Sequence, residues 1–536
     1  MRPGSRRSPA ADLAFELERL LAFALKTGLL EREDVIPARN ALLDLFGLAE
    51  PAEADPEALM ADVPDRSPAP ILERLLDLAH EIGLLPENTA THRDLLDARI
   101  MGLLMPRASE TNRKFWRIAR ETSIEAATDF FYRQSIAANY IMIERVARNE
   151  YWLAETEYGE LEITVNLSKP EKDPHEIAML RNAPAVSYPK CVLCAENAGY
   201  AGRINHPARQ NHRLISLELC GEPWYFQYSP YVYYNEHSIV LHRDHIPMRI
   251  TPMTFRRLAA FLDQFPHYFI GSNADLPIVG GSILVHEHYQ AGRHRFPMEK
   301  APVEAAFFHP DFPGVKAGIV RWPLSVLRLS CAPQGREQLL SLADHVLALW
   351  RAYSDPSVGV LAFSEAPDAA GSVRPHNTIT PIARHNAAGE LELDLVLRNN
   401  RTDEAHPEGI FHPGRHLHHI KKENIGLIEV MGLAVLPGRL KEELAGIRRI
   451  LTGEDRYDPA ALSEGNHPLA GHAAWIAELV AARGTSMGPE EAESLLRAEV
   501  GRKFAEVLAD CGVFKRDGSG RAAFRRFLAH AGFSAW

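Results

Sequence analysis

Cysteine is scarce in this chain, with 5 residues among 536. So few thiols in so long a chain exclude a disulfide framework, and Cys220, Cys331 and Cys511 are predicted to be buried thiols. The sequence also lacks an apolar run of the roughly 20 residues that a membrane-spanning helix needs. Three arginines among residues 1–10 are not followed by the apolar segment of a signal peptide. These absences predict a protein of the reducing cytoplasm with no membrane segment.

The chain also has no excess of basic residues. It contains 59 Lys and Arg and 70 Asp and Glu, which gives a net charge of −11. A general nucleic-acid binder needs a basic surface, so this balance argues against one. A nucleotide ligand stays compatible, since it needs only a few local cations. The length predicts about three or four folding units.

The chain divides into four regions. Residues 1–155 are predicted to be mostly helical, with Leu13, Leu17 and Leu20 at helical spacing. Residues 156–305 and 306–445 are predicted to be two α+β regions with antiparallel strands, and residues 446–536 to be helical again. Within these regions we expect helices at 123–149 and 254–265, strands at 161–165, 224–231 and 238–242, and a half-buried strand at 391–397. The predicted fold class is therefore α+β.

The run His286-Glu287-His288-Tyr289-Gln290 lies between Gly280-Gly281-Ser282 and Gly292. On a strand, His286, His288 and Gln290 would point to one face, because successive side chains alternate. Imidazole is neutral and nucleophilic near pH 7. The run therefore predicts either one structural and one reactive histidine, or an incidental pair in a chain with 24 histidines.

A Cys-x-x-Cys pair, Cys191 and Cys194, permits three interpretations: a zinc half-site, a redox dithiol or coincidence. A zinc site needs two more ligands, usually Cys or His. There is no second Cys-x-x-Cys, so the missing ligands would be histidines. His245 and His286 are the best candidates by residue type.

Taken in order, Cys-x-x-Cys, Asp244-His245 and His-x-His-x-Gln resemble the signature of the galactose-1-phosphate uridylyltransferases of the histidine-triad superfamily. The sequence is similar to the long, second type of that family over about residues 128–440. The stretches that carry the resemblance are 191–203, 281–290, 377–384, 397–402 and 418–432. The resemblance implies two histidine-triad-like α/β modules with antiparallel sheets, together with helical N-terminal and C-terminal extensions.

The resemblance implies a two-step transfer of UMP from UDP-glucose to galactose 1-phosphate in galactose metabolism. His288 would be the nucleophile, and Gln290 and Ser282 would hydrogen-bond the phosphates. The implied substrate contacts are phosphate-binding Lys169 and Lys172, nucleotide-side Asn273, the backbone at Gly280 and Gly281, and hexose-side Lys422 and Glu429.

The resemblance also implies a closed structural zinc site made of Cys191, Cys194, His245 and His286. A second metal is left open, with Glu304 and His412 as candidates by position. His412, His416, His418 and His419 form either a metal cluster or a loop that exposes polar side chains. The family suggests a homodimer.

Two other functions stay open from the sequence. The chain could be another histidine-triad nucleotidyl transferase, phosphorylase or hydrolase acting on a different nucleotide, or it could be a zinc-binding module without catalysis. Hydrolases of this superfamily typically carry a third histidine at the position of Gln290. The hexose-side stretch at 424–429 would have no use in them, so both features favour transfer over hydrolysis.

Overall fold

The structure, a computed structural model, describes residues 8–168, 186–281, 283–365 and 373–536. Lys169, Lys172 and Ser282 lie outside these residues. The chain forms two compact units. Unit 1 comprises Met1–Arg148, Ser168–Ile246 and His286–His288, and unit 2 comprises Asn149–Leu167, Pro247–Val285 and Tyr289–Trp536. Both units are built from several chain segments, so the boundaries at 155, 305 and 445 stay predictions.

Unit 1 begins with helices, as its apolar periodicity predicts. In α1 (Pro9–Thr27) the Ser8 hydroxyl accepts the Ala11 N–H, and Gly28 ends the helix at φ +71°. Its apolar face, which includes Leu13, Leu17 and Leu20, is buried. The other helices of this unit are α2 (Val35–Phe46), α3 (Pro56–Leu59), α4 (Ala69–Glu81), α5 (Ala90–Gly102), α6 (Ala108–Glu121), α7 (Ile124–Ala137) and α8 (Ile143–Val146).

The helix predicted at 123–149 is shorter in the structure. It ends at Ala137 because Asn139 adopts φ +52°, a left-handed conformation that asparagine tolerates better than most residues. Phe131 of α7 contacts Phe226 and Tyr228, and the Tyr228 hydroxyl donates to the Thr128 carbonyl. These contacts pack α7 against the strands of unit 1.

Those strands are β3 (Ile215–Leu219), β4 (Glu222–Tyr228) and β5 (Ser238–His242), paired antiparallel in sequence order. The predicted strands at 224–231 and 238–242 are thus present, the first ending earlier at Tyr228. Cys220 lies in the β3–β4 turn at φ +53° and is exposed, so its prediction as a buried thiol was wrong. Cys331 and Cys511 are buried as predicted.

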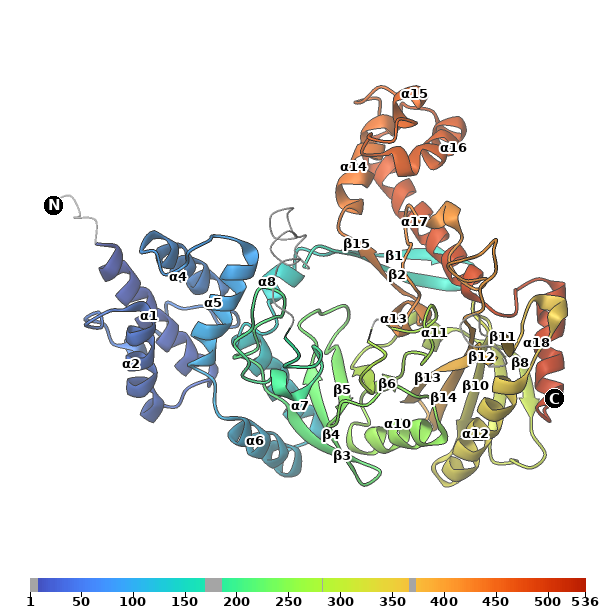
Figure 1. Cartoon of the computed structure of the whole chain (residues 1–536), viewed down its shortest axis with the longest axis horizontal. Helices are drawn as coiled ribbons and strands as arrows, with labels where there is room; N and C mark the ends of the chain where they lie inside the picture. The colour runs from blue at the N-terminus through green and yellow to red at the C-terminus, as the bar shows by residue number, and fades with distance from the viewer. Residues whose placement is uncertain (1–7, 169–185, 282, 366–372) are drawn as a thin grey trace. The chain divides into compact units, whose positions relative to one another are not determined.

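Unit 2 contains a long sheet whose strands run in the order β16-β8-β9-β10-β14-β13-β6-β7. Helices α10 (Pro252–Gln264) and α12 (Arg336–Ala352) pack against one another and against this sheet (Figure 1). The strands are β6 (Phe269–Gly271), β7 (His288–Gly292), β8 (Val303–Phe308), β9 (Lys316–Val320), β10 (Val326–Cys331), β13 (Asn377–His385), β14 (Leu391–Asn399) and β16 (Ser534–Ala535).

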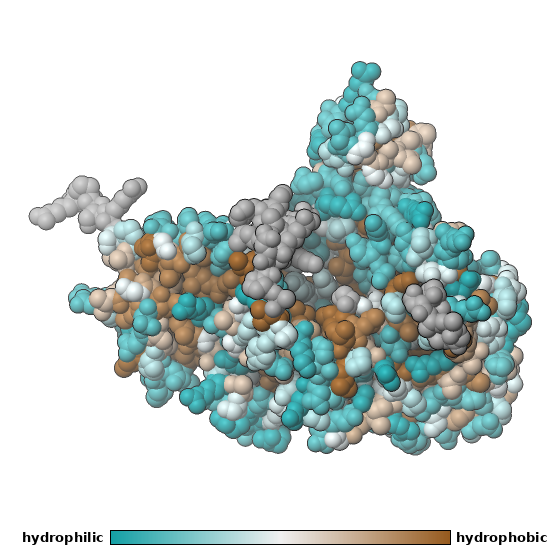
Figure 2. All heavy atoms as spheres, viewed as in Figure 1, coloured by the Kyte–Doolittle hydropathy of each residue, from teal (hydrophilic) through white to brown (hydrophobic). Residues whose placement is uncertain are grey.

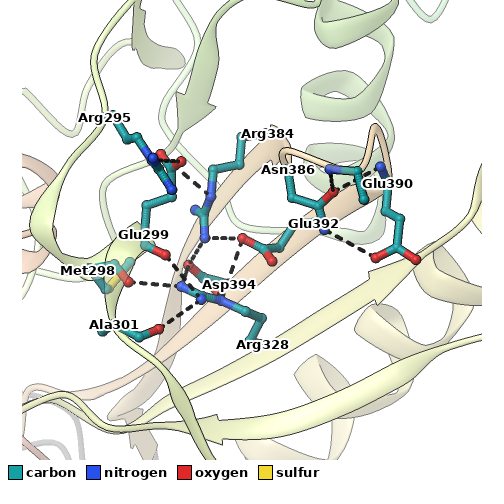
Figure 3. Close-up of polar contacts among 11 residues, drawn as sticks. Arg295, Met298, Glu299, Ala301, Arg328, Arg384, Asn386, Glu390, Glu392 and Asp394 are labelled. Carbon is teal, nitrogen blue, oxygen red and sulfur yellow. Dashed lines mark hydrogen bonds and ion pairs between the residues drawn. The ribbon is translucent and has the colours of Figure 1, made fainter.

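Strand β14 was predicted to be half-buried, and this was wrong, since all nine of its residues are buried. Its alternating acidic residues face arginines rather than water (Figure 3). Asp394 accepts from Arg328 Nε at 2.7 Å and from Arg384 Nη2 at 2.7 Å, and Glu392 pairs with Arg384. Burial alone would raise the pKa of Asp394, but the two arginines hold it below its usual value. The ion pairs allow charged residues inside the sheet.

A second sheet in unit 2 joins β1 (Glu150–Thr156), β2 (Gly159–Asn166) and β15 (Leu433–Pro437). The strand predicted at 161–165 lies within β2. A short hairpin pairs β11 (Phe363–Glu365) with β12 (Val373–Pro375). The C-terminal region is helical as predicted, apart from the two residues of β16. Figure 2 shows both hydrophilic and apolar residues on the surface of its first three helices. The remaining helices are α11 (Pro297–Lys300), α13 (Leu427–Val430), α14 (Leu440–Leu451), α15 (Pro459–Leu462), α16 (Ala473–Arg483), α17 (Pro489–Cys511) and α18 (Gly518–His530).

The mixed helices and mainly antiparallel strands confirm the α+β class. Within the described ranges, every helix is too short or too polar to cross a lipid bilayer.

Candidate functional site

Four residues of unit 1 meet in a group that could hold a metal ion. Cys191, Cys194, His245 and His286 each offer one ligand atom, and all four atoms lie within 4.8 Å of one another. The Cys191 and Cys194 sulfurs are 3.5 Å apart. Cys191 Sγ lies 3.3 Å from His286 Nδ1, and Cys194 Sγ lies 3.1 Å from His245 Nδ1.

These distances fit a tetrahedral zinc site. With Zn–S near 2.3 Å and Zn–N near 2.05 Å, tetrahedral ligands would be separated by about 3.3–3.8 Å. Four of the six ligand-atom spacings, at 3.1–3.7 Å, are close to those values, and all six are within 4.8 Å. Two thiolates and two imidazoles also form a donor set that zinc prefers. Burial raises the pKa of the Cys194 thiol to about 11, so metal binding at neutral pH would release a proton.

The local fold prepares these ligands. Asn197 Nδ2 donates to the carbonyl oxygens of Cys191 and Cys194, both at 2.8 Å, and so closes the loop between the thiols. His286 Nε2 donates to the His242 carbonyl at 2.8 Å, which leaves Nδ1 unprotonated and facing the sulfurs. Burial also lowers the pKa of His286, which favours the neutral, ligating form.

The predicted strand around the His-x-His-x-Gln run is only partly correct. Strand β7 begins at His288, and His286 lies in the irregular segment before it. The Glu287 N–H donates to the Ile246 carbonyl, and its own carbonyl accepts the His242 N–H. His286 is therefore held by its own contacts at the metal group rather than by alternation along a strand.

His288 is oriented by the backbone of His286. Its Nδ1 lies 2.8 Å from the His286 carbonyl oxygen, which can only accept, so Nδ1 carries the proton. Nε2 is then the unprotonated, nucleophilic nitrogen. His288 is 5% exposed, and burial lowers its pKa to about 4, against the opposing effect of its hydrogen bond to the His286 carbonyl. The ring is thus neutral throughout the physiological pH range.

Gln290 follows two residues later on β7, opposite Gly271 of β6. Its buried Oε1 has no hydrogen-bond partner within the described ranges. Burying an amide oxygen without a partner is costly. Rotation of the terminal amide exchanges its oxygen and nitrogen. The amide N–H of Gln290 could then take the unpartnered position and donate to a ligand.

The glycine pair before the run lies in a tightly closed loop of unit 2. A Cβ at Gly280 would lie 2.3 Å from the Ala274 carbonyl oxygen, and a Cβ at Gly281 would lie 2.6 Å from Asn273 Nδ2. Only glycine allows such approaches. Asn273 itself is 4% exposed, and its Oδ1 accepts the Leu427 N–H at 2.8 Å. It therefore joins the glycine loop to the start of α13.

On the predicted hexose side, the structure brings Glu429 together with Lys421 rather than with Lys422. Lys421 is buried, and its Nζ donates to Glu429 Oε1 at 3.0 Å and to the Val435 carbonyl at 3.1 Å. Glu429 Oε2 accepts the Gly426 N–H at the start of α13. Lys422 is exposed. Sequence reasoning missed Lys421, because two adjacent lysines give no signal of which one is buried.

The candidates for a second metal are not brought together in the described part of the chain. Both oxygens of Glu304 accept hydrogen bonds from Arg516, at 2.6 and 2.7 Å. His412 contacts Asn424 through Nε2 at 3.2 Å. Among the described residues, the cysteine–histidine group is the only one of at least three close potential ligands.

The histidines at 412–419 also have separate partners. His418 Nε2 donates to the Pro413 carbonyl at 3.0 Å, whereas His419 Nδ1 lies 2.7 Å from His472 Nδ1. Glu443 in turn accepts from His472 Nε2 at 2.9 Å. The metal-cluster interpretation of this stretch is therefore not supported.

Two family models match the chain. Residues 29–247 match the model described as galactose-1-phosphate uridyl transferase, N-terminal domain, and residues 261–451 match the corresponding C-terminal domain. Relatives named galactose-1-phosphate uridylyltransferase include one from Caldanaerobacter subterraneus subsp. tengcongensis, 60% identical over 97% of this chain and 98% of the relative. Those from Halalkalibacterium halodurans and Bacillus subtilis are 52% and 46% identical, over 97% and 96% of this chain and 99% and 97% of the relatives.

Proposed function

The chain belongs to the galactose-1-phosphate uridylyltransferase family, and we propose that it transfers UMP from UDP-glucose to galactose 1-phosphate through a covalent intermediate on His288. The observation that carries this proposal is the orientation of His288. Its Nδ1–H is bound to the His286 carbonyl, so its lone pair is on Nε2. The products are glucose 1-phosphate and UDP-galactose.

In the first step, His288 Nε2 attacks the α-phosphorus of UDP-glucose. A nitrogen–phosphorus bond forms, the bond from the α-phosphorus to the bridging oxygen breaks, and glucose 1-phosphate leaves with that oxygen. The Nδ1 proton stays in place, and the His286 carbonyl stabilises the positive charge that develops on the ring. No separate base is needed, because the buried ring is already neutral.

In the second step, a phosphate oxygen of galactose 1-phosphate attacks the same phosphorus. The nitrogen–phosphorus bond breaks, UDP-galactose forms and His288 returns to its neutral state. Gln290 would donate its amide N–H to an α-phosphate oxygen in both steps, and its unpartnered buried amide oxygen supports this role. Ser282 and the backbone at Gly280 and Gly281 would contact the phosphates, together with Lys169 and Lys172.

Cys191, Cys194, His245 and His286 would hold a structural zinc ion. Four protein ligands leave no open position, so the ion would contribute rigidity rather than Lewis-acid chemistry. His286 provides both a ligand nitrogen and the carbonyl that orients His288. A zinc ion that fixes His286 would therefore also fix the orientation of the His288 ring.

On the acceptor side, the Lys421–Glu429 ion pair would shape the hexose site. Lys421 fixes one carboxylate oxygen, and the Gly426 N–H fixes the other. Glu429 would present its remaining lone pairs to a sugar hydroxyl. Asn273 would hold the glycine loop and the start of α13 in register, in addition to its predicted contact with the nucleotide.

The test is to incubate the protein with UDP-glucose labelled in the α-phosphate, without an acceptor. We expect one equivalent of glucose 1-phosphate to be released and one label per chain to appear on His288. His288→Gly should abolish both, whereas His406→Gly, which removes an exposed histidine, should leave both unchanged. Added galactose 1-phosphate should then remove the label as UDP-galactose.

Normal exchange between UDP-glucose and galactose 1-phosphate in His288→Gly would refute the mechanism. Release of free UMP at the rate of transfer would instead favour the hydrolase alternative. Labelling without discharge by galactose 1-phosphate would point to another acceptor, such as inorganic phosphate.

A further inference from the structure

A pocket in unit 2 combines an apolar wall with an unusual number of arginines. It has a volume of about 200 Å³. Ile319, Phe514 and Phe524 contribute apolar surface to its lining. Glu304, Arg516, Arg521 and Arg525 also line it. No part of the proposed transfer reaction uses this pocket.

Glu304 is the only acidic residue among the lining side chains, and its charge is already paired. Arg516 binds both oxygens of Glu304, at 2.6 and 2.7 Å. That bidentate contact is the main cause that holds the pKa of Glu304 below its usual value. Arg516 Nε is nevertheless buried and has no hydrogen-bond partner in the described part of the chain. Glu304 thus fixes the orientation of the Arg516 guanidinium.

Arg521 and Arg525 lie four residues apart on α18, so both side chains project from the same face of the helix. Like charges at this spacing repel one another and do not stabilise the helix. Neither arginine forms an ion pair within the residues that the structure describes, although Arg521 is close enough to Glu304 to lower its pKa further. An anionic ligand would relieve the repulsion.

The pocket is remote from the nucleophile-bearing strand. Its residues Glu304 and Ala305 lie on β8, and the sheet order runs β8-β9-β10-β14-β13-β6-β7. Six interstrand steps of about 4.8 Å separate β8 from β7 by roughly 29 Å. The pocket is therefore remote from Gln290 on β7, which the proposed transfer uses.

We propose that this pocket binds a phosphate monoester, with the phosphate held by Arg516, Arg521 and Arg525 and the carbon body against Ile319, Phe514 and Phe524. Planar guanidinium groups bind phosphate oxygens in pairs, and three of them suit a dianion better than a single carboxylate. The apolar wall distinguishes a monoester from free phosphate. The ligand is small, since the volume of about 200 Å³ leaves no room for a dinucleotide.

The test measures binding of radiolabelled glycerol 1-phosphate to the full chain by equilibrium dialysis at low ionic strength. The double variant R521Q/R525Q should bind at least tenfold more weakly. The matched control R32Q/R415Q removes the same charge from two exposed arginines outside the pocket and should bind normally. All the substituted arginines are partly or fully exposed, and the melting temperatures of the three proteins should agree.

Three results would overturn the proposal. One is equal binding by R521Q/R525Q and the unsubstituted protein. Another is displacement of glycerol 1-phosphate by UDP-glucose, which would place the probe in the transfer site. The third is equally tight binding of inorganic phosphate, which would remove the role of the apolar wall. Because the assay needs no turnover, its failure is independent of whether His288 is the nucleophile.

Discussion

Lowering the pH of the first half-reaction tests the environment of His288 directly. Burial is the main cause that lowers its pKa from an ordinary 6.5 to about 4. This difference corresponds to about 3.4 kcal/mol in favour of the neutral ring, at about 1.36 kcal/mol per pKa unit. At pH 5.5, an imidazole with a pKa of 4 is about 97% neutral, whereas one with a pKa of 6.5 is about 9% neutral. The two cases therefore predict rates that differ about tenfold.

The assay is a single-turnover quench experiment with excess UDP-glucose, no acceptor and constant ionic strength, between pH 8 and pH 5.5. The measured quantity is the rate at which label appears on the protein. We expect the rate at pH 5.5 to stay within about twofold of the rate at pH 7.5, because only the neutral ring attacks and the buried ring stays neutral. No acid limb should appear within this range, because its midpoint would lie near pH 4.

A tenfold fall with a midpoint near pH 6.5 would refute the reasoning, since it would mean that His288 titrates as a solvated imidazole. Acid could also protonate the metal ligands and release the metal. Samples held at pH 5.5 and returned to pH 7.5 before mixing provide the control. Full recovery of the rate and an unchanged zinc content separate titration of the nucleophile from loss of the site.

Three further outcomes are expected. Cys191→Ser should lower zinc content and melting temperature more than it lowers the rate of the protein that stays folded, and unchanged zinc content would exclude Cys191 as a ligand. Asp394→Asn removes the partner of two buried arginines and should cost about 3–5 kcal/mol in denaturant unfolding. Arg32→Ala breaks an exposed pair with Glu57 and should cost about 0.5 kcal/mol or less; equal costs would contradict this difference. Because the native pKa of Asp394 is depressed, its contribution should be present near pH 7 and be lost as the pH falls below about 4. Lys421→Met should lower kcat/KM for galactose 1-phosphate at least about tenfold, with Lys422→Met close to normal, and similar effects of both would remove the distinction between them.

Burial was the property that sequence patterns predicted least well. The alternation in β14 correctly predicted a strand, but its acidic residues indicated a solvent-facing side. Arg328 and Arg384 come from the neighbouring strands β10 and β13 and cover that side. The same difficulty arose at Lys421 and Lys422, where the packing around each side chain decides which one is enclosed. An alternating pattern records polarity, whereas burial depends on residues that are distant in the chain.

The run His-x-His-x-Gln illustrates a further limit. Residue types alone left open whether the two histidines were one structural and one reactive, or an incidental pair. The irregular segment at His286 arises because backbone pairing of β7 with β6 covers only Phe269–Gly271 and Gln290–Gly292. Strand ends are set by such pairings, and hydrophobic periodicity does not locate them within a residue or two.

The sequence by itself determined the family, the α+β class and the residues able to carry the chemistry. Ordered motifs such as Cys191-x-x-Cys194 and His286-x-His288 record chemical identity directly. Only the tertiary structure decided how those residues meet. It places His286 Nδ1 near sulfurs that are 92 and 95 positions away in the chain, and it turns the carbonyl of the same residue toward the ring of His288. Contacts over such separations depend on how the whole unit packs, because no local preference of the chain specifies them.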